Sequence, residues 1–89
     1  MLSIKLLTSF EKDLKYYAKK HRTFPKLTQI KNELRIGVPL HGRYRDHALV
    51  GNYAGWRELH VEKDVLLIYR IIDDRVEFAR LGSHDELFG

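Results

Sequence analysis

The sequence predicts an α+β fold, because helical and strand patterns occupy separate parts of a chain of 89 residues. The first half carries one short alternating segment and two segments with a helical period. The last third carries three alternating segments separated by short turns. We therefore expect an N-terminal strand and two helices to pack on a mainly antiparallel four-stranded sheet. A chain of this length predicts a single domain over residues 1–89.

The N-terminal third predicts a strand followed by a helix. Residues 2–7 alternate between apolar and polar side chains, as expected for a strand. Thr8 and Glu11 fit a capping box, which favours a helix over roughly residues 8–21. The apolar residues of this segment recur at helical spacing and are interpreted as core: Phe10, Leu14 and Tyr17.

A second helix is predicted over residues 25–36, with Gly37 as its stop signal. Its inward face is formed by Leu27, Ile30 and Leu34. Residues 37–55 contain several glycines and prolines and are expected to form a long ordered loop, a feature that is often functional.

Three strands are predicted in the last third, over residues 56–61, 65–72 and 75–81, with turns at 62–63 and 73–74. Two-residue turns would set three cross-strand pairs: His60 with Val65, Leu67 with Arg80, and Arg70 with Glu77. The last pair joins opposite charges, which supports the register.

This register sorts the side chains of the strands onto two faces. The face expected beneath the helices carries Leu59, Val61, Leu66, Ile68, Ala79 and Leu81. The opposite face carries Trp56, Glu58, His60, Val65, Leu67, Tyr69, Phe78 and Arg80. His60 and Arg80 then lie near the same end of the sheet, with Asp64 in the adjoining turn and His84 just after the last strand.

Such a group suits RNA cleavage by the RNA's own 2′-hydroxyl, which needs a base, an acid and cations around the phosphate. Histidine can fill either proton-transfer role near neutral pH, and arginine grips phosphate in a bidentate manner. Each residue also has a structural interpretation: Asp64 is a common turn residue, and Arg80 could pair with Glu58. A metal site of His60, Asp64 and His84 is a further alternative, although no tight ligand motif occurs.

Composition limits the remaining classes of function. The absence of cysteine excludes disulfide scaffolds, cysteine zinc sites and thiol nucleophiles. A net charge of +4 favours an anionic partner such as nucleic acid. No basic segment precedes a long apolar run, so we expect a cytoplasmic protein without a membrane partner.

Three segments carry a resemblance to a known family: YRDHAL at 44–49, WRELHVEKD at 56–64 and RLGSHDELF at 80–88. Together they resemble the YafQ branch of the RelE superfamily, which comprises toxins of type II toxin–antitoxin systems that cut mRNA in the ribosomal A site. The resemblance covers almost the whole chain and is strongest over residues 44–88. It implies a RelE-like fold of the microbial ribonuclease type, ending in a short C-terminal helix or tail.

The resemblance also implies roles for individual residues. The implied catalytic residues are His47, His60, Asp64 and His84, with Arg80 on the scissile phosphate and Phe88 near the base. His84 matches the family's general acid, while the general base is left open among His47, His60 and Asp64. No metal or other cofactor is implied.

The implied partners are the ribosome, mRNA and a small antitoxin, often with a ribbon-helix-helix DNA-binding part. Operator DNA would be bound only through the antitoxin complex. A toxin that acts without catalysis, by occupying the ribosome or gyrase, is the alternative.

Overall fold

A computed structural model describes residues 1–89 and shows a five-stranded sheet in the order β1-β5-β4-β3-β2. The strands are β1 (Ser3–Leu6), β2 (His47–Ala48), β3 (Arg57–Glu62), β4 (Val65–Ile72) and β5 (Arg75–Gly82). The α-helices are α1 (Thr8–Lys19), α2 (Pro25–Ile36) and α3 (His84–Phe88), and two 3₁₀ turns are η1 (Gly42–Tyr44) and η2 (Gly51–Tyr53). None of these helices is long and apolar enough to cross a membrane.

The sheet is mainly antiparallel, and only β1 and β5 pair in parallel. Four strands were expected, but the sheet has five. The additional strand is β2, which lies within the loop predicted over residues 37–55 and pairs with β3. Two residues are too few to show an alternating pattern, so this strand has no signal in the sequence.

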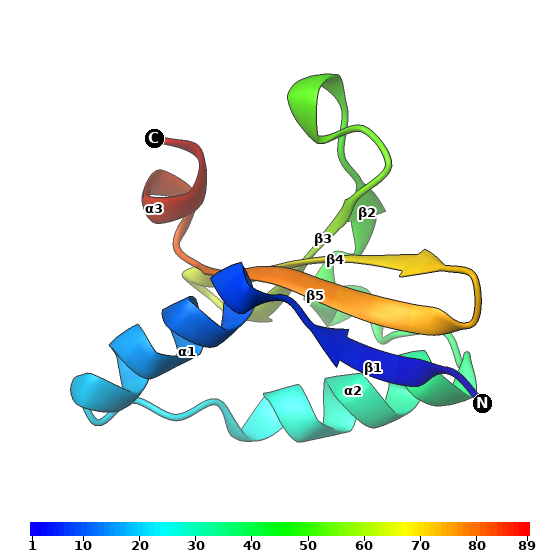
Figure 1. The fold of residues 1–89 in the computed structure, drawn as a ribbon, viewed down its shortest axis with the longest axis horizontal. Coiled ribbons are helices and arrows are strands. Elements are labelled where there is room, and N and C mark those ends of the chain that lie inside the picture. The colour runs from blue at the N-terminus through cyan, green and yellow to red at the C-terminus, as the bar shows by residue number, and fades with distance from the viewer.

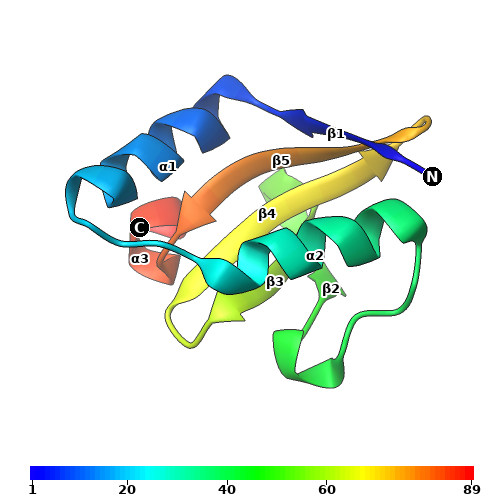
Figure 2. The same cartoon turned by 90° about the horizontal axis from the view of Figure 1, so that it is seen from below.

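Helices α1 and α2 cover one face of the sheet, whereas α3 and the η2 turn rise from the other face (Figures 1 and 2). The predicted helical stripes pack against the sheet: Phe10, Tyr17, Leu27, Ile30 and Leu34 are buried, and Leu14 is partly buried against the same core. Helix α2 matches its predicted bounds, and Gly37 after it adopts a left-handed φ of 88°, which glycine tolerates best.

The start of α1 differs from the prediction. Thr8 is already the first helical residue, Leu7 occupies the N-cap position, and no side chain caps the helix. The amide of Glu11 therefore donates to the Leu7 carbonyl instead of to the Thr8 hydroxyl. A capping box does occur in the chain, but it lies at α3, where Ser83 and Glu86 form it.

Two β-bulges change the predicted register. The turn between β3 and β4 comes one residue later than predicted, so Glu62 pairs with Val65. A β-bulge between His60 and Glu62 then pairs His60 with Leu66, not with the predicted Val65. Between β4 and β5, the predicted Arg70–Glu77 pair is confirmed, but a second irregularity beyond Tyr69 pairs Ile68, not Leu67, with Arg80.

A shift of one residue moves a strand's side chains to the opposite face. The β4 assignment was accordingly wrong: Val65, Leu67 and Tyr69 belong to the helix-side core, and Leu66 and Ile68 to a smaller cluster. Two residues of β5 were also assigned to the wrong faces. Phe78 packs in the helix-side core, where Ala79 was expected, and Ala79 packs in the smaller cluster on the opposite face. That smaller cluster also contains Leu87 of α3.

Candidate active site

Strand pairing brings two imidazoles to one buried carboxylate. The short strand β2 pairs His47 with Glu58 of β3, and His60 follows two residues later on β3. Glu58 Oε2 lies 3.3 Å from Nε2 of His47 and 3.9 Å from Nε2 of His60. The other ring nitrogen of His47, Nδ1, lies 2.7 Å from the carbonyl oxygen of Arg45. A protonated His47 can therefore donate from both nitrogens, one to Arg45 and one to Glu58.

The environment of His60 favours its neutral form. Burial lowers the pKa of His60 from its ordinary 6.5, and the positive charge of Arg45 lowers the pKa further, while the Glu58 carboxylate opposes the shift. The ring is therefore unprotonated near neutral pH, and an unprotonated imidazole can accept a proton.

Three of the candidate residues meet around one open cavity of about 280 Å³. His60 reaches it from β3, Asp64 from the turn after β3, and His84 from the first turn of α3. Its complete lining is Glu58, His60, Lys63, Asp64, Leu66, Ser83, His84 and Asp85. The side chain of Asp64 is 71% exposed and lies 3.4 Å from the guanidinium of Arg22. The end of β3 with its turn and the first turn of α3 thus supply two imidazoles and a carboxylate to one cavity.

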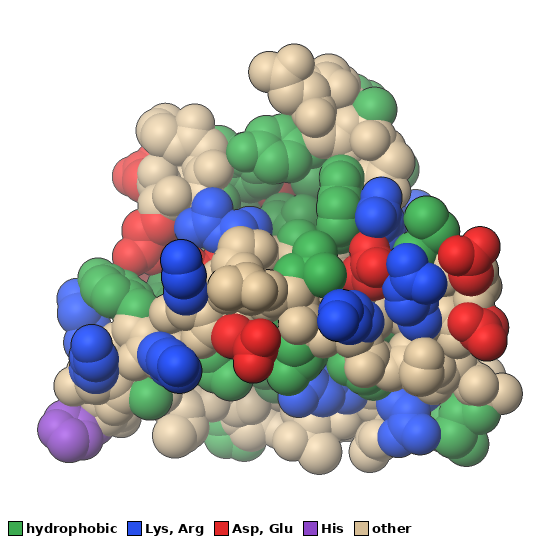
Figure 3. Space-filling model, in the orientation of Figure 1, with side chains coloured by type: hydrophobic (Ala, Val, Ile, Leu, Met, Phe, Trp, Pro, Cys, Tyr) green, Lys and Arg blue, Asp and Glu red, His purple; other side chains and the backbone are tan.

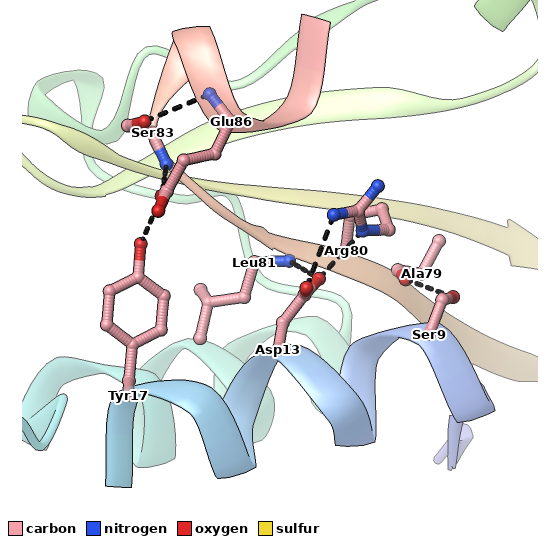
Figure 4. Close-up of polar contacts among 8 residues, drawn as sticks. All are labelled: Ser9, Asp13, Tyr17, Ala79, Arg80, Leu81, Ser83 and Glu86. Atoms are coloured by element: carbon pink, nitrogen blue, oxygen red, sulfur yellow. Dashed lines mark hydrogen bonds and ion pairs between the residues drawn. The ribbon is translucent and has the colours of Figure 1, made fainter. Parts of the chain in front are cut away.

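The helix that carries His84 is anchored from below by α1 (Figure 4). The Ser83 hydroxyl accepts from the amide of Glu86 at 3.1 Å, and Glu86 Oε1 accepts from the amide of Ser83 at 2.9 Å. The same Glu86 oxygen accepts the Tyr17 hydroxyl at 2.7 Å. A Cβ at Gly82 would lie only 3.1 Å from Leu87, so α3 packs closely on the end of β5. A five-residue helix is too short to be stable alone, and these contacts hold it in place.

Arg80 does not line the cavity. Its Nε donates to Asp13 Oδ2 at 2.7 Å and its Nη2 donates to Oδ1 at 3.2 Å, which ties the guanidinium to α1 (Figure 4). Asp13 also accepts the amide of Leu81 at 2.9 Å. Arg80 was expected to lie near His60, and this prediction was wrong. It assumed a regular β4–β5 register, whereas the bulge beyond Tyr69 shifts Arg80 by one position. The alternative pairing of Arg80 with Glu58 is not observed either, because Asp13 takes that place.

Phe88 lies at the end of α3 beside His84, with 5.1 Å between the ring centroids. Tyr53 of η2 meets the Phe88 ring edge-on at 5.0 Å. Between α3 and the η2 loop, hydrophobic side chains cover the floor of the open face (Figure 3). The smaller cluster consists of four buried residues, Leu66, Ile68, Ala79 and Leu87, and the partly buried Leu7, Leu49, Trp56 and Phe88 pack against it.

Several residues of the site were not singled out as candidates from the sequence. Glu58 had a usable signal, because it lies two residues before His60 and therefore on the same strand face. Lys63 and Arg45 had none: Lys63 has the pattern of a turn residue, and Arg45 reaches His60 only through the path of the long loop. No group of three or more His, Asp or Glu side chains converges closely enough to hold a metal ion.

The sequence matches, over residues 2–89, the family described as bacterial toxin of type II toxin-antitoxin system, YafQ. The chain belongs to the YafQ toxin family. It is 40% identical over 81 residues to the mRNA interferase toxin YafQ of Escherichia coli K12, covering 90% of this chain and 88% of the relative.

Solved structures of bacterial toxins, including YafQ, share the fold. A copper-bound point mutant of a Helicobacter pylori toxin superposes with a TM-score of 0.94 at 39% identity, covering 99% of this chain and 100% of the other. YafQ in the E. coli DinJ–YafQ complex superposes with a TM-score of 0.87 at 37% identity, covering 100% of both chains. The α+β fold predicted from the sequence is therefore confirmed as that of the YafQ toxins.

Proposed function

We propose that this YafQ-family toxin is a ribosome-dependent mRNA endoribonuclease that inhibits translation without a metal ion. The observation that carries the proposal is the meeting of His60, Asp64 and His84 around one cavity, with His60 held neutral. Family membership supports the same reaction, because curated relatives are mRNA interferases.

In the proposed reaction, His60 accepts the proton of the RNA 2′-hydroxyl, whose oxygen then attacks the adjacent phosphorus. The bond from phosphorus to the 5′-oxygen breaks, and His84 donates a proton to that leaving oxygen. The products are a 2′,3′-cyclic phosphate and a free 5′-hydroxyl. His60 is preferred over His47 as the base because only His60 lines the cavity, and its ring is unprotonated near neutral pH. It is preferred over Asp64 because the Asp64 side chain is 71% exposed and faces the Arg22 guanidinium at 3.4 Å. Glu58 keeps the His47 and His60 rings in place.

Two further residues act on the RNA outside proton transfer. Phe88, beside His84, offers an aromatic surface for the base next to the cleaved bond. The resemblance assigns Arg80 to the scissile phosphate. Because Asp13 holds its guanidinium and Arg80 does not line the cavity, this contact requires Arg80 to leave Asp13 and turn toward the bound RNA, where a phosphate offers the same bidentate acceptor geometry.

The proposed partners follow from the family and the charge of the chain. The ribosome holds mRNA in the in-line geometry that a small open cavity cannot impose alone. A cognate antitoxin, of the ribbon-helix-helix type, binds the toxin, and operator DNA is bound only by that complex. A structure of the E. coli relative with DinJ supports an antitoxin partner here. The site of action is the cytoplasm, where mRNA is translated.

The variant His84→Gln tests the reaction. We expect mRNA cleavage on programmed ribosomes to fall at least about 100-fold, because the leaving oxygen loses its proton donor. Thermal stability should stay unchanged, since His84 is exposed. Antitoxin binding is measured in the same variant and should be retained, because the substitution leaves the fold intact. Mapping of mRNA 5′ ends in cells separates cleavage from occupancy, because occupancy creates no new ends.

Two outcomes would contradict the proposal. Growth arrest by folded His84→Gln without new 5′ ends would favour a toxin that acts by occupancy. Loss of wild-type cleavage in EDTA, with restoration by a transition metal under conditions that keep the ribosome intact, would favour a metal-dependent reaction.

A further inference from the structure

A second open cavity, of about 180 Å³, adjoins the first and shares His60 and Lys63 with it. Its lining comes from α2, from the η1 segment of the long loop and from the end of β3. The residues are Lys26, Arg43, Tyr44, Arg45, His60, Val61, Glu62 and Lys63. Nothing in the proposed chemistry uses the part of this cavity that lies beyond His60.

The charge of this second cavity is uncompensated. Four of its side chains are cationic, and all four are exposed: Lys26, Arg43, Arg45 and Lys63. None of them forms an ion pair with a carboxylate within 4.0 Å. The only carboxylate of the lining, Glu62, already pairs with Arg22 at 2.7 Å. Converging cations without anionic partners attract a ligand that carries negative charge.

The backbone holds one of these cations in an uncommon conformation. Arg45 has a φ of 52°, in the left-handed region that non-glycine residues seldom adopt. Its carbonyl oxygen contacts the His47 ring at 2.7 Å, and its guanidinium is close enough to His60 to lower the pKa of that ring. The same residue thus joins the cationic cavity to the two imidazoles.

We propose that this second cavity binds a backbone phosphate of the RNA next to the scissile phosphate. The inference rests on the proposed function, because an RNA strand whose scissile phosphate lies at His60 continues along the strand into a neighbouring hollow. Arg43 and Arg45 present bidentate donors, and Lys26 and Lys63 add point charges around the same anion. The ligand class is a phosphodiester of single-stranded RNA.

The test compares the double variant Arg43→Gln/Arg45→Gln with a matched control, Lys15→Gln/Lys19→Gln. The control removes the same charge from positions of α1 that line neither cavity. The probe is a short single-stranded RNA with a 2′-O-methyl group at the cleavage position, which prevents the reaction. We expect the cavity variant to bind about tenfold more weakly than the control. The slope of log K against log salt should become shallower by about 0.7 for each phosphate that the variant no longer neutralises.

A probe with one neutral methylphosphonate beside the blocked position identifies the phosphate that the cavity binds. It should bind the wild-type protein more weakly than the fully charged RNA does, whereas the cavity variant should bind both probes equally. On programmed ribosomes the variant should raise KM. Equal RNA binding by the cavity and control variants would overturn the inference, and so would weaker antitoxin binding with unchanged RNA binding. Undiminished cleavage by His84→Gln would instead refute the proposed reaction, because the subsite is judged by binding alone.

Discussion

Removing one hydroxyl group should loosen the helix that carries His84. In Tyr17→Phe, the ring keeps its packing, but Glu86 loses the hydrogen bond that it accepts from Tyr17 at 2.7 Å. Tyr17 is only 6% exposed, whereas the Glu86 carboxylate that accepts the bond is exposed, so water replaces part of this bond. A hydrogen bond to a charged group contributes about 1.5 kcal/mol at the lower end of measured values. At about 4–8 °C per kcal/mol for a domain of this size, the melting temperature should fall by about 6–12 °C.

The assay combines stability with local opening and activity. Thermal unfolding gives the change in melting temperature, and hydrogen exchange of the Leu87 amide, which donates to the Ser83 carbonyl at 3.0 Å, reports on α3 itself. Exchange at Leu87 should accelerate, and mRNA cleavage below the unfolding transition should fall about tenfold because His84 is less well positioned.

Tyr16→Phe is the matched control for this variant. It makes the same chemical change at the neighbouring position, where the hydroxyl accepts only from Lys20 at an exposed site. An unchanged melting temperature and unchanged exchange at Leu87 in Tyr17→Phe would refute the idea that α1 anchors α3. A lower melting temperature with normal exchange and normal cleavage would restrict Tyr17 to a role in the core.

Three further outcomes follow from other contacts. Tyr69→Phe removes a buried hydroxyl that donates to Asp46 at 2.7 Å, so thermal unfolding should show a destabilisation of about 1.5 kcal/mol. Burial also raises the pKa of Tyr69 above 10.0, so the wild type should lose stability as pH rises beyond 10, and Tyr69→Phe should lose less. The Arg75 guanidinium lowers the pKa of Glu77 below 4.5; stability should therefore decline as pH falls below that value, and urea titrations of Glu77→Gln should show a weaker decline. Burial lowers the pKa of His60, so an NMR titration of its ring should have a midpoint below 6.5. The stability of the protein should decrease as pH falls from 6.5 towards that midpoint, because the unfolded chain then binds the proton more readily. A midpoint above 6.5 would contradict the assigned burial.

Periodicity alone predicted most of the fold. The apolar stripes of α1 and α2 span several turns each, and Gly37 marks the end of α2, so both helices were found close to their true bounds. The Asp73–Asp74 turn and the Arg70–Glu77 pair were also correct. These features depend on residues close in sequence, where pattern rules apply.

The main error in the predicted fold concerns the faces of β4, which depend on tertiary packing. The bulge after His60 moved Val65 and Leu67 beneath the helices, where both are buried in the larger hydrophobic cluster. β4 is a nearly continuous run of apolar residues, so either set of alternate positions could face the helices. The sequence of β4 therefore could not reveal the bulge or decide the register.

The candidate site likewise combines features that the local sequence indicates with features that only the tertiary fold determines. The capping box of α3 and the position of Glu58 two residues before His60 are local patterns and can be found in the sequence. The partner of Arg80 lies in α1, 67 positions away, and no local pattern indicates Asp13. Likewise, the approach of Arg45 to His60 depends on how the loop returns to the sheet. The strand register had already singled out His60, Asp64, Arg80 and His84, and the resemblance to the YafQ toxins added His47 and Phe88.

The strand order has a consequence for how the toxin is made. β5 is the last strand to leave the ribosome, yet it lies between β1 and β4 and joins the first strand in parallel. Synthesis proceeds from the N-terminus, so a nascent chain without residues 75–89 lacks both the strand that completes the sheet and the segment with His84. Such distant pairings also form slowly. A nascent chain that has reached only β4 therefore holds neither the complete sheet nor the residue proposed as general acid, and it cannot yet act as the proposed nuclease.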